Sequence, residues 1–129
     1  RVCSIEVEKL SLDAGAEAAA RIVSVPPADR PTAVFAANDL LAIGLLQGLV
    51  AAGLRVPEDI AIVGYDDIAF AAAATVPLSS VRQPRKEVGR RSAELLLAEM
   101  ADDSQHHHET VRYTPQLIVR RSSALTVRP

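Results

Sequence analysis

The chain has 129 residues, of which 49% are hydrophobic, 3% aromatic and 23% charged. This is enough for one domain whose core is built from aliphatic side chains. The formal net charge of −2 argues against nucleic-acid binding by this segment itself, because a basic footprint is expected there, but it does not exclude a DNA-binding domain outside the segment.

The first elements alternate between strand and helix patterns. Residues 2–7 have the apolar alternation of a strand, and the alanine-rich residues 14–25 follow as a helix. Ser11 and Asp13 offer side-chain oxygens that can cap this helix. Because proline has no backbone donor and disfavours helix in the residue before it, we expect the helix to end at Pro26.

Two short, unbroken apolar runs are the most informative part of the chain. Residues 33–37 and 60–65 each end abruptly in polar side chains, which is the pattern of a strand buried on both faces. Residues 40–52 lie between them and predict a helix that is apolar nearly all round, so it should bury more than one face. Asp39 is placed to cap this helix, and Gly53 to end it in a left-handed conformation.

The second half continues the alternation. It predicts a short helix over 67–74, a strand over 78–82, a helix over 86–100 and a last strand over 110–121 that is interrupted by Pro115. In the helix over 86–100, the residues expected to face inward are Val88, Ala93, Leu96 and Met100. Alternating strands and helices predict the α/β class, with an open, mostly parallel sheet flanked by helices.

Polar side chains follow the two buried strands directly. In an open parallel sheet, ligands bind outside the carboxyl ends of the strands, which makes Asn38 and Asp66 the first candidates for a binding site. Asn38 offers both donors and acceptors, and Asp66 can accept two hydrogen bonds from a polyol. Alternatively, Asn38 and Asp39 form a helix cap and a turn, and one member of the Asp66–Asp67 pair braces its loop.

No pattern in the sequence predicts catalysis, a metal or a cofactor. Gly44, Gly48 and Gly53 match no nucleotide-binding loop and instead suit close packing of helices. Residues 106–108 are three consecutive histidines followed by Glu109, but adjacent side chains point in different directions and do not converge on one ion. All histidines lie in this polar loop and no nucleophile elbow is present, so we expect a protein that is not an enzyme.

Cysteine content and hydropathy bear on the compartment. Cys3 is the single cysteine, so no disulfide within the chain points to an oxidising compartment. The apolar runs are interrupted well before the roughly 18 residues that a membrane span needs. We therefore expect a cytoplasmic protein without a membrane partner. The chain begins at Arg1, directly before a strand pattern, and we expect it to be a piece of a longer protein.

Five motifs in register resemble the lactose/galactose-repressor (LacI/GalR) family of bacterial transcription regulators. They are PTAVFAANDLLAIG at 31–44, GLRVPEDIAIVGYDD at 53–67, PLSSVRQP at 77–84, VG at 88–89 and PQLIVRRS at 115–122. The resemblance implies a two-lobed sensor like the type I periplasmic binding proteins, of which residues 1–129 are the C-terminal part. It also implies that residues 86–101 pack with the other lobe, and that a helix-turn-helix domain lies outside this chain.

The resemblance also assigns functions to individual residues. Asn38 and Asp66 match positions that bind the effector, in agreement with the strand-end argument, and Arg85 and Leu10 match positions that line the cleft. Leu10 stands where sugar and purine sensors often have an aromatic ring that stacks on the ligand, and Arg85 could suit an anionic effector. The residues that match the subunit interface are Leu41, Ala42, Leu45, Ala73 and Ala74.

The sequence therefore predicts the ligand-sensing domain of a homodimeric, DNA-binding transcription regulator that acts as a repressor. Its effector would be a small polar molecule, such as a sugar or a sugar derivative, held between the lobes. Ligand binding would change the contact with operator DNA through the helix-turn-helix domain, with a coupling of about 1–3 kcal/mol. A periplasmic sugar-binding protein of a transporter is the alternative on the same fold, and an enzyme on this scaffold is a further one.

Overall fold

In the computed structural model, residues 2–101 and 108–124 are described. The chain divides into two compact units. Unit 1 comprises residues 1–82 and 117–129, and it contains most of the sheet and three of the helices. Unit 2 comprises residues 83–116 and contains one long helix.

The sheet has four strands in the order β1-β2-β3-β4. Their bounds are Ala33–Phe35 for β1, Ala61–Tyr65 for β2, Ser79–Arg82 for β3 and Gln116–Ile118 for β4. β1 pairs in parallel with β2, with Phe35 opposite Val63, and β2 pairs in parallel with β3, with Tyr65 opposite Val81. This arrangement confirms the predicted α/β class with its open, mostly parallel sheet.

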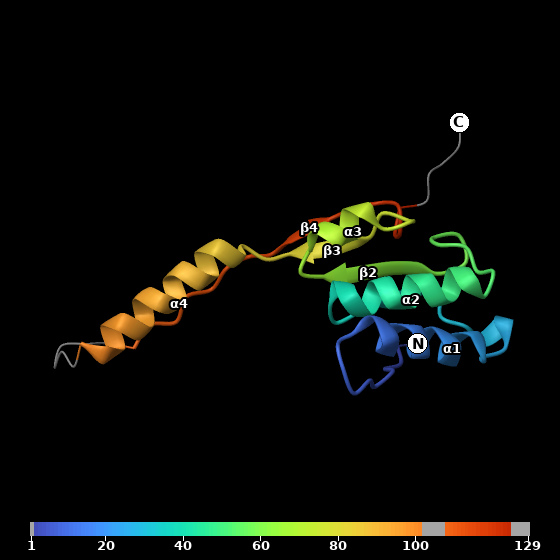
Figure 1. The fold of residues 1–129 in the computed structure, drawn as a ribbon, viewed down its shortest axis with the longest axis horizontal. Helices are drawn as coiled ribbons and strands as arrows, with labels where there is room; N and C mark the ends of the chain where they lie inside the picture. The colour runs from blue at the N-terminus through green and yellow to red at the C-terminus, as the bar shows by residue number, and fades with distance from the viewer. Residues whose placement is uncertain (1, 102–107, 125–129) are drawn as a thin grey trace. The chain divides into compact units, whose positions relative to one another are not determined.

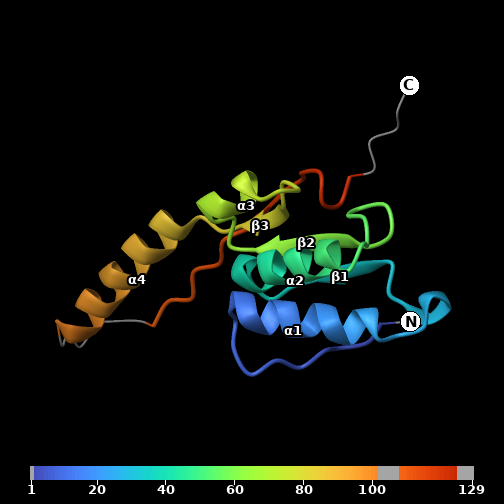
Figure 2. The ribbon, with the colours of Figure 1, turned by 45° about the vertical axis from the view of Figure 1, so that its right-hand side comes forward.

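Three α-helices pack in unit 1. They are α1 (Leu12–Val23), α2 (Asp39–Ala51) and α3 (Ala69–Ala73), with a short 3-10 turn, η1, at Pro27–Asp29. α2 lies between α1 and β2, while α3 packs against β3 (Figures 1 and 2). The prediction that α2 buries more than one face is confirmed, because Leu45, Leu46 and Leu49 are each at most 2% exposed.

Two glycines allow α1 and α2 to approach closely. A Cβ atom at Gly44 would overlap the carbonyl group of Leu12, and one at Gly15 would overlap the carbonyl oxygen of Leu41. The two helix backbones are therefore in direct contact. This confirms that Gly44 serves close helix packing.

The helix caps differ from the prediction at one position. The Ser11 side chain caps α1 by accepting from the Ala14 amide at 3.3 Å, as expected. At α2, however, Asn38 is the N-cap, and its Oδ1 accepts from the Leu41 amide at 2.9 Å. The expected cap, Asp39, is instead the first helical residue and is fully buried. Either residue has a suitable side chain, so only the start of the helix decides between them.

Two predicted strands are corrected by the structure. Residues 2–7 contain no strand, although Ile5 and Val7 pack against the core. The last strand, β4, covers only Gln116–Ile118 and begins directly after Pro115 instead of running from 110 to 121. Proline cannot donate to a ladder, so pairing begins after it.

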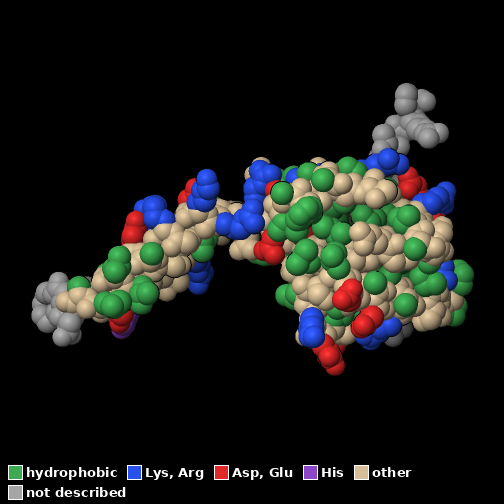
Figure 3. Space-filling model, in the orientation of Figure 1, with side chains coloured by type: hydrophobic (Ala, Val, Ile, Leu, Met, Phe, Trp, Pro, Cys, Tyr) green, Lys and Arg blue, Asp and Glu red, His purple; other side chains and the backbone are tan. Residues whose placement is uncertain are grey.

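Unit 2 consists mainly of α4, at Arg85–Met100. No residue of α4 is buried, and Leu96, Leu97 and Met100 are each more than 60% exposed. Figure 3 shows hydrophobic side chains, coloured green, exposed along this helix. The inward positions predicted for this helix are therefore exposed among the residues that the structure describes.

Within residues 2–101 and 108–124, no helix combines the length and the apolar character that crossing a membrane requires.

Candidate functional site at the carboxyl edge of the sheet

Asn38 and Asp66 each lie just beyond the carboxyl end of one of two neighbouring strands. β1 and β2 pair in parallel, with Phe35 opposite Val63. Asn38 follows the last residue of β1, Phe35, by three residues, and Asp66 directly follows the last residue of β2, Tyr65. Both therefore lie at the carboxyl edge of the sheet. Open α/β sheets bind ligands at this edge.

Asn38 connects the start of α2 to the segment before α1. Its Oδ1 accepts from the Leu41 amide, and its Nδ2 donates to the carbonyl oxygen of Leu10 at 3.3 Å. The structure thus brings two of the predicted site residues, Asn38 and Leu10, into contact. An amide side chain has two donor hydrogens and two acceptor lone pairs, so Asn38 keeps capacity for a ligand. Leu10 itself is 52% exposed.

Asp66 lies in a tight turn at the end of β2. Its backbone φ is 102° and that of Asp67 is 50°, so two consecutive residues with side chains are in the left-handed region. Such residues are uncommon and cluster at functional sites when the surrounding structure holds them. The Asp66 amide donates to the carbonyl oxygen of Val81 at 2.9 Å, which ties the turn to β3. The Asp66 side chain is partly exposed.

Asp67 is the member of the acidic pair that braces the loop. Its side chain is 5% exposed and forms ion pairs with Arg82 at 2.6 Å and Arg120 at 2.7 Å. Burial works to raise the pKa of this carboxyl, but the hydrogen bonds and charges of Arg120 and Arg82 outweigh it and lower the pKa below its ordinary value. Asp67 thus anchors the turn to β3 and to the segment after β4.

Asp39 and Ser80 complete the support of this turn, whereas the sequence predicted Asp39 only as a helix cap and did not indicate Ser80. Asp39 Oδ2 accepts from the Ile68 amide at 2.8 Å, and Asp39 Oδ1 accepts from Ser80 Oγ at 2.6 Å. Ser80 Oγ in turn accepts from the Asp67 amide at 3.0 Å. Applying the strand-end rule to the third strand, as to the first two, would have indicated Arg82, but no sequence signal indicates Ser80.

Arg85 belongs to unit 2, where it is the first residue of α4 and has an exposed side chain. Its backbone amide donates to the carbonyl oxygen of Gln83 at 2.8 Å. A role for Arg85 beside Asn38 and Asp66 stays a prediction.

Three residues expected at a subunit interface lie inside the domain instead. Leu41, Ala42 and Leu45 are 9%, 0% and 2% exposed, because the face of α2 that carries them packs within unit 1. Their side chains are therefore not available to a second subunit. The helix is apolar all round, so the sequence did not distinguish its inner face from its outer one.

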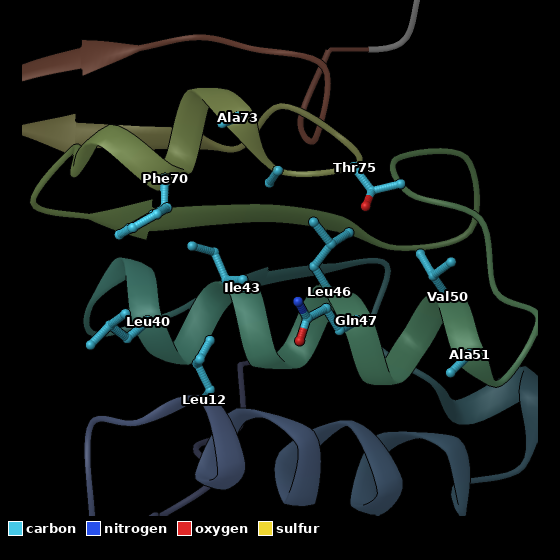
Figure 4. Close-up of a pocket in the computed structure, with 11 residues that line it drawn as sticks. Leu12, Leu40, Ile43, Leu46, Gln47, Val50, Ala51, Phe70, Ala73 and Thr75 are labelled. Carbon is cyan, nitrogen blue, oxygen red and sulfur yellow. The ribbon is translucent and has the colours of Figure 1, made fainter.

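Ala73 and Ala74, the other two expected interface residues, line an open apolar groove between α2 and α3. Its volume is about 600 Å³. Figure 4 shows Phe70 of α3 on one side and Ile43 and Val50 of α2 on the other. Phe70 is 70% exposed and Val50 is 42% exposed, so this groove presents apolar surface to solvent.

The histidine loop lies largely outside the described residues. His106 and His107 lie outside the described residues, and His108 Nδ1 is 3.2 Å from Glu99 Oε2. Among residues 2–101 and 108–124, no three His, Cys, Asp or Glu side chains are grouped as metal ligands would be.

Comparison with known proteins identifies the family. The sequence profile of the periplasmic binding protein-like domain matches residues 3–123, which is nearly the whole chain. The chain belongs to this family. Similar proteins include the HTH-type transcriptional repressor PurR of Vibrio vulnificus, 45% identical over 92 residues, which cover 71% of this chain and 27% of that protein.

Further similar proteins lead to the same regulators. The arabinose metabolism transcriptional repressor of Geobacillus stearothermophilus is 42% identical over 107 residues, which cover 83% of this chain and 29% of that protein. A LacI-family regulator from Lactobacillus casei, solved with bound glucose, is 32% identical with a TM-score of 0.74, covering 88% of this chain and 40% of that one. The predicted resemblance to the lactose/galactose-repressor family is confirmed, and the chain spans less than a third of the two repressors it matches.

Proposed function

We propose that this LacI-family chain is the C-terminal part of the sensor of a DNA-binding transcription regulator, and that it binds a small polar effector at the carboxyl edge of its sheet. The effector is a sugar or a sugar derivative. Asn38 and Asp66 bond its hydroxyl groups, Leu10 covers an apolar face and Arg85 contacts a polar or anionic edge. The chain catalyses no reaction in this proposal.

The placement of Asn38 and Asp66 just beyond the carboxyl ends of β1 and β2 carries this proposal. An amide and a carboxylate at neighbouring strand ends supply the donors and acceptors that a polyol needs. Two of the similar regulators are named with a sugar, and this supports the ligand class. One is a repressor of arabinose metabolism, and the other was solved with bound glucose. Because these relatives are regulators, the alternative of a transporter's sugar-binding protein has less support.

Removing the Asp66 carboxylate should weaken effector binding by about 10–100-fold, because hydrogen bonds to a charged group contribute about 1.5–3 kcal/mol. Asp66→Gly is the suitable variant, since glycine adopts the observed φ of 102° without strain. The measurement is calorimetric titration of the full-length protein with a panel of pentoses, hexoses, disaccharides and nucleosides, followed by titration of the variant with the tightest of them.

Asp29→Ala provides the control. Asp29 is an exposed carboxylate in η1, which precedes β1 and therefore lies toward the amino edge of the sheet. Its removal should leave the affinity unchanged. If no member of the panel binds, or if Asp66→Gly binds as tightly as the parent, the site is assigned incorrectly.

The second part of the proposal concerns assembly. We propose that the groove between α2 and α3 pairs with the same groove of a second copy, so that the regulator is a homodimer. A two-fold interface brings one patch of each subunit against the same patch of the other. Ala73, Ala74 and the exposed Phe70 and Val50 give this surface the apolar character of an interface core.

Ala73→Arg should separate the dimer into monomers at micromolar concentration, because it places an unpaired charge in the apolar groove. Ala72→Arg is the matched control, since Ala72 is an exposed residue of the same helix that does not line the groove. Light scattering coupled to size-exclusion chromatography measures the mass of both variants. A dimer that survives Ala73→Arg, or that is lost equally in both variants, contradicts this interface.

The remaining partners follow from the same proposal. The exposed apolar side chains of α4, in residues 86–101, would be covered by the other lobe of the sensor. Operator DNA would be bound by a helix-turn-helix domain elsewhere in the protein. Effector binding between the lobes would then change the spacing of the two DNA-binding domains.

A further inference from the structure

We propose that Asp39 and Ser80 are the positioning residues of the effector site: together they hold the turn that carries Asp66 and fix it to the helix that begins at Asn38. This inference rests on the proposed function and deepens it. Neither residue touches the ligand in this account, because both side chains are completely buried. They act through the backbone of the turn.

The turn needs such support because of its conformation. Asp66 and Asp67 both have positive φ, which residues with side chains adopt only where the surroundings hold them. Asp67 N–H donates to Ser80 Oγ, and Ile68 N–H donates to Asp39 Oδ2. The two backbone amides that directly follow Asp66 are therefore both held by this pair.

The pair is itself joined by a short hydrogen bond. Ser80 Oγ donates to Asp39 Oδ1 at 2.6 Å while it accepts from the Asp67 amide. The Ser80 hydroxyl group thus links the backbone of the turn to the Asp39 carboxyl group through two hydrogen bonds. Three elements meet at this point, since Asp39 begins α2, Ser80 belongs to β3 and the turn follows β2.

Asp39 also links the turn to the second effector-binding candidate. Asn38 is the preceding residue, and it caps the same helix that Asp39 begins. One carboxyl group therefore holds the Asp66 turn at a fixed place relative to Asn38. Displacing the turn would change the separation of the amide and the carboxylate that the proposed ligand bridges.

The sequence leaves room for this carboxyl group at Gly64. A Cβ atom at Gly64 would overlap Asp39 Oδ1 and would lie 3.2 Å from Leu78. Only a residue without a side chain allows the carboxyl group to lie against β2. The position of Asp39 thus depends on β2 as well as on its own helix.

Ser80→Ala tests the inference with the least disturbance, because it removes one hydroxyl group and leaves the carboxyl groups of Asp39 and Asp66 in place. Asp67 N–H and Asp39 Oδ1 each lose a partner, which should speed hydrogen exchange in a peptide covering residues 65–71 by about 10-fold or more. Exchange measured by mass spectrometry on the full-length protein without ligand gives this result. A second variant, Asp39→Asn, should act in the same direction because it removes an acceptor.

Ser122→Ala is the matched control. Ser122 is also completely buried, and its hydroxyl donates to the carbonyl oxygen of Ile62 and accepts from the Ser79 amide. It should lower the midpoint of urea unfolding as Ser80→Ala does, yet leave the exchange of residues 65–71 unchanged relative to the rest of the domain. This comparison separates positioning of the turn from general stabilisation.

Affinity provides the second readout. For the tightest sugar of the panel, Ser80→Ala should weaken binding at least about 10-fold, and Ser122→Ala should not. If the folded Ser80→Ala protein keeps the exchange of residues 65–71, the inference is overturned. If the parent binds no sugar, the proposed function fails and the exchange comparison alone decides whether these residues hold the turn.

Discussion

Replacing Gly44 with alanine is expected to destabilise the domain by about 3 kcal/mol, at the upper end of the range for overpacked cores. A Cβ atom at this position would overlap the carbonyl group of Leu12, which is backbone and cannot move aside like a flexible side chain. α1 and α2 would have to separate, and the contacts that bury Leu45 and Ile22 would loosen. Urea unfolding followed by circular dichroism measures the loss.

The chain offers a matched glycine for comparison. Gly89 also lies inside a helix, α4, but an added Cβ would meet nothing within 4 Å. Gly89→Ala should therefore raise helix stability by about 0.5–1 kcal/mol, the usual preference for alanine over glycine in a helix. Equal effects at the two positions would contradict the direct backbone contact of α1 with α2.

Removing the Asp67 carboxylate is expected to cost about 3 kcal/mol, as is typical when one partner of a buried ion pair is lost. Arg120 has a side chain only 17% exposed and would remain charged without its acidic partner, and Arg82 would lose its partner as well. Asp67→Ala should thus lower the free energy of unfolding at neutral pH. Asp59→Ala is the control, because its ion pair with Arg55 lies at the surface and should contribute little.

The effect of Asp67→Ala on the free energy of unfolding should depend on pH. The pKa of Asp67 is lowered in the folded protein, so its contribution to stability is fully present above the unfolded value of about 3.9. It is lost as the pH falls through the lower, folded pKa. The difference in unfolding free energy between the parent and Asp67→Ala should be constant from pH 7 to 5 and shrink below about pH 4. A difference that stays constant in acid would contradict the ion pairs.

The local patterns in the sequence predicted most of the fold. The apolar runs that became β1 and β2 and the all-apolar helix α2 were identified because burial on both sides leaves a pattern within a few residues. Gly53 was identified as a helix end, and its φ of 83° agrees with that. The prediction of a strand over residues 2–7 was wrong, because a strand also needs a hydrogen-bonded neighbour and apolar alternation cannot show whether one is present.

The candidate site was predicted less completely than the fold. The strand-end rule indicated Asn38 and Asp66, and the register of β1 and β2 places them at the same edge. It could not tell that Asn38 would cap α2 while Asp39 turned inward, since adjacent residues with similar side chains can exchange these roles.

The residues that hold the Asp66 turn and the groove between α2 and α3 could be recognised only from the three-dimensional structure. Ser80 contributes through contacts with residues distant in sequence, to Asp39 and Asp67, which no local pattern encodes. The sequence likewise did not show which face of α2 points outward, because the helix is apolar all round. The structure shows it, since Val50 lines the groove while the other faces are packed.

The most direct test of the account is a crystal structure of the full-length protein with the tightest sugar of the panel. The account predicts that the Asp66 carboxylate and the Asn38 amide each lie about 3 Å from hydroxyl groups of the same ligand, at the carboxyl edge of β1 and β2. A ligand bound elsewhere, with neither side chain in contact with it, would contradict the central claim.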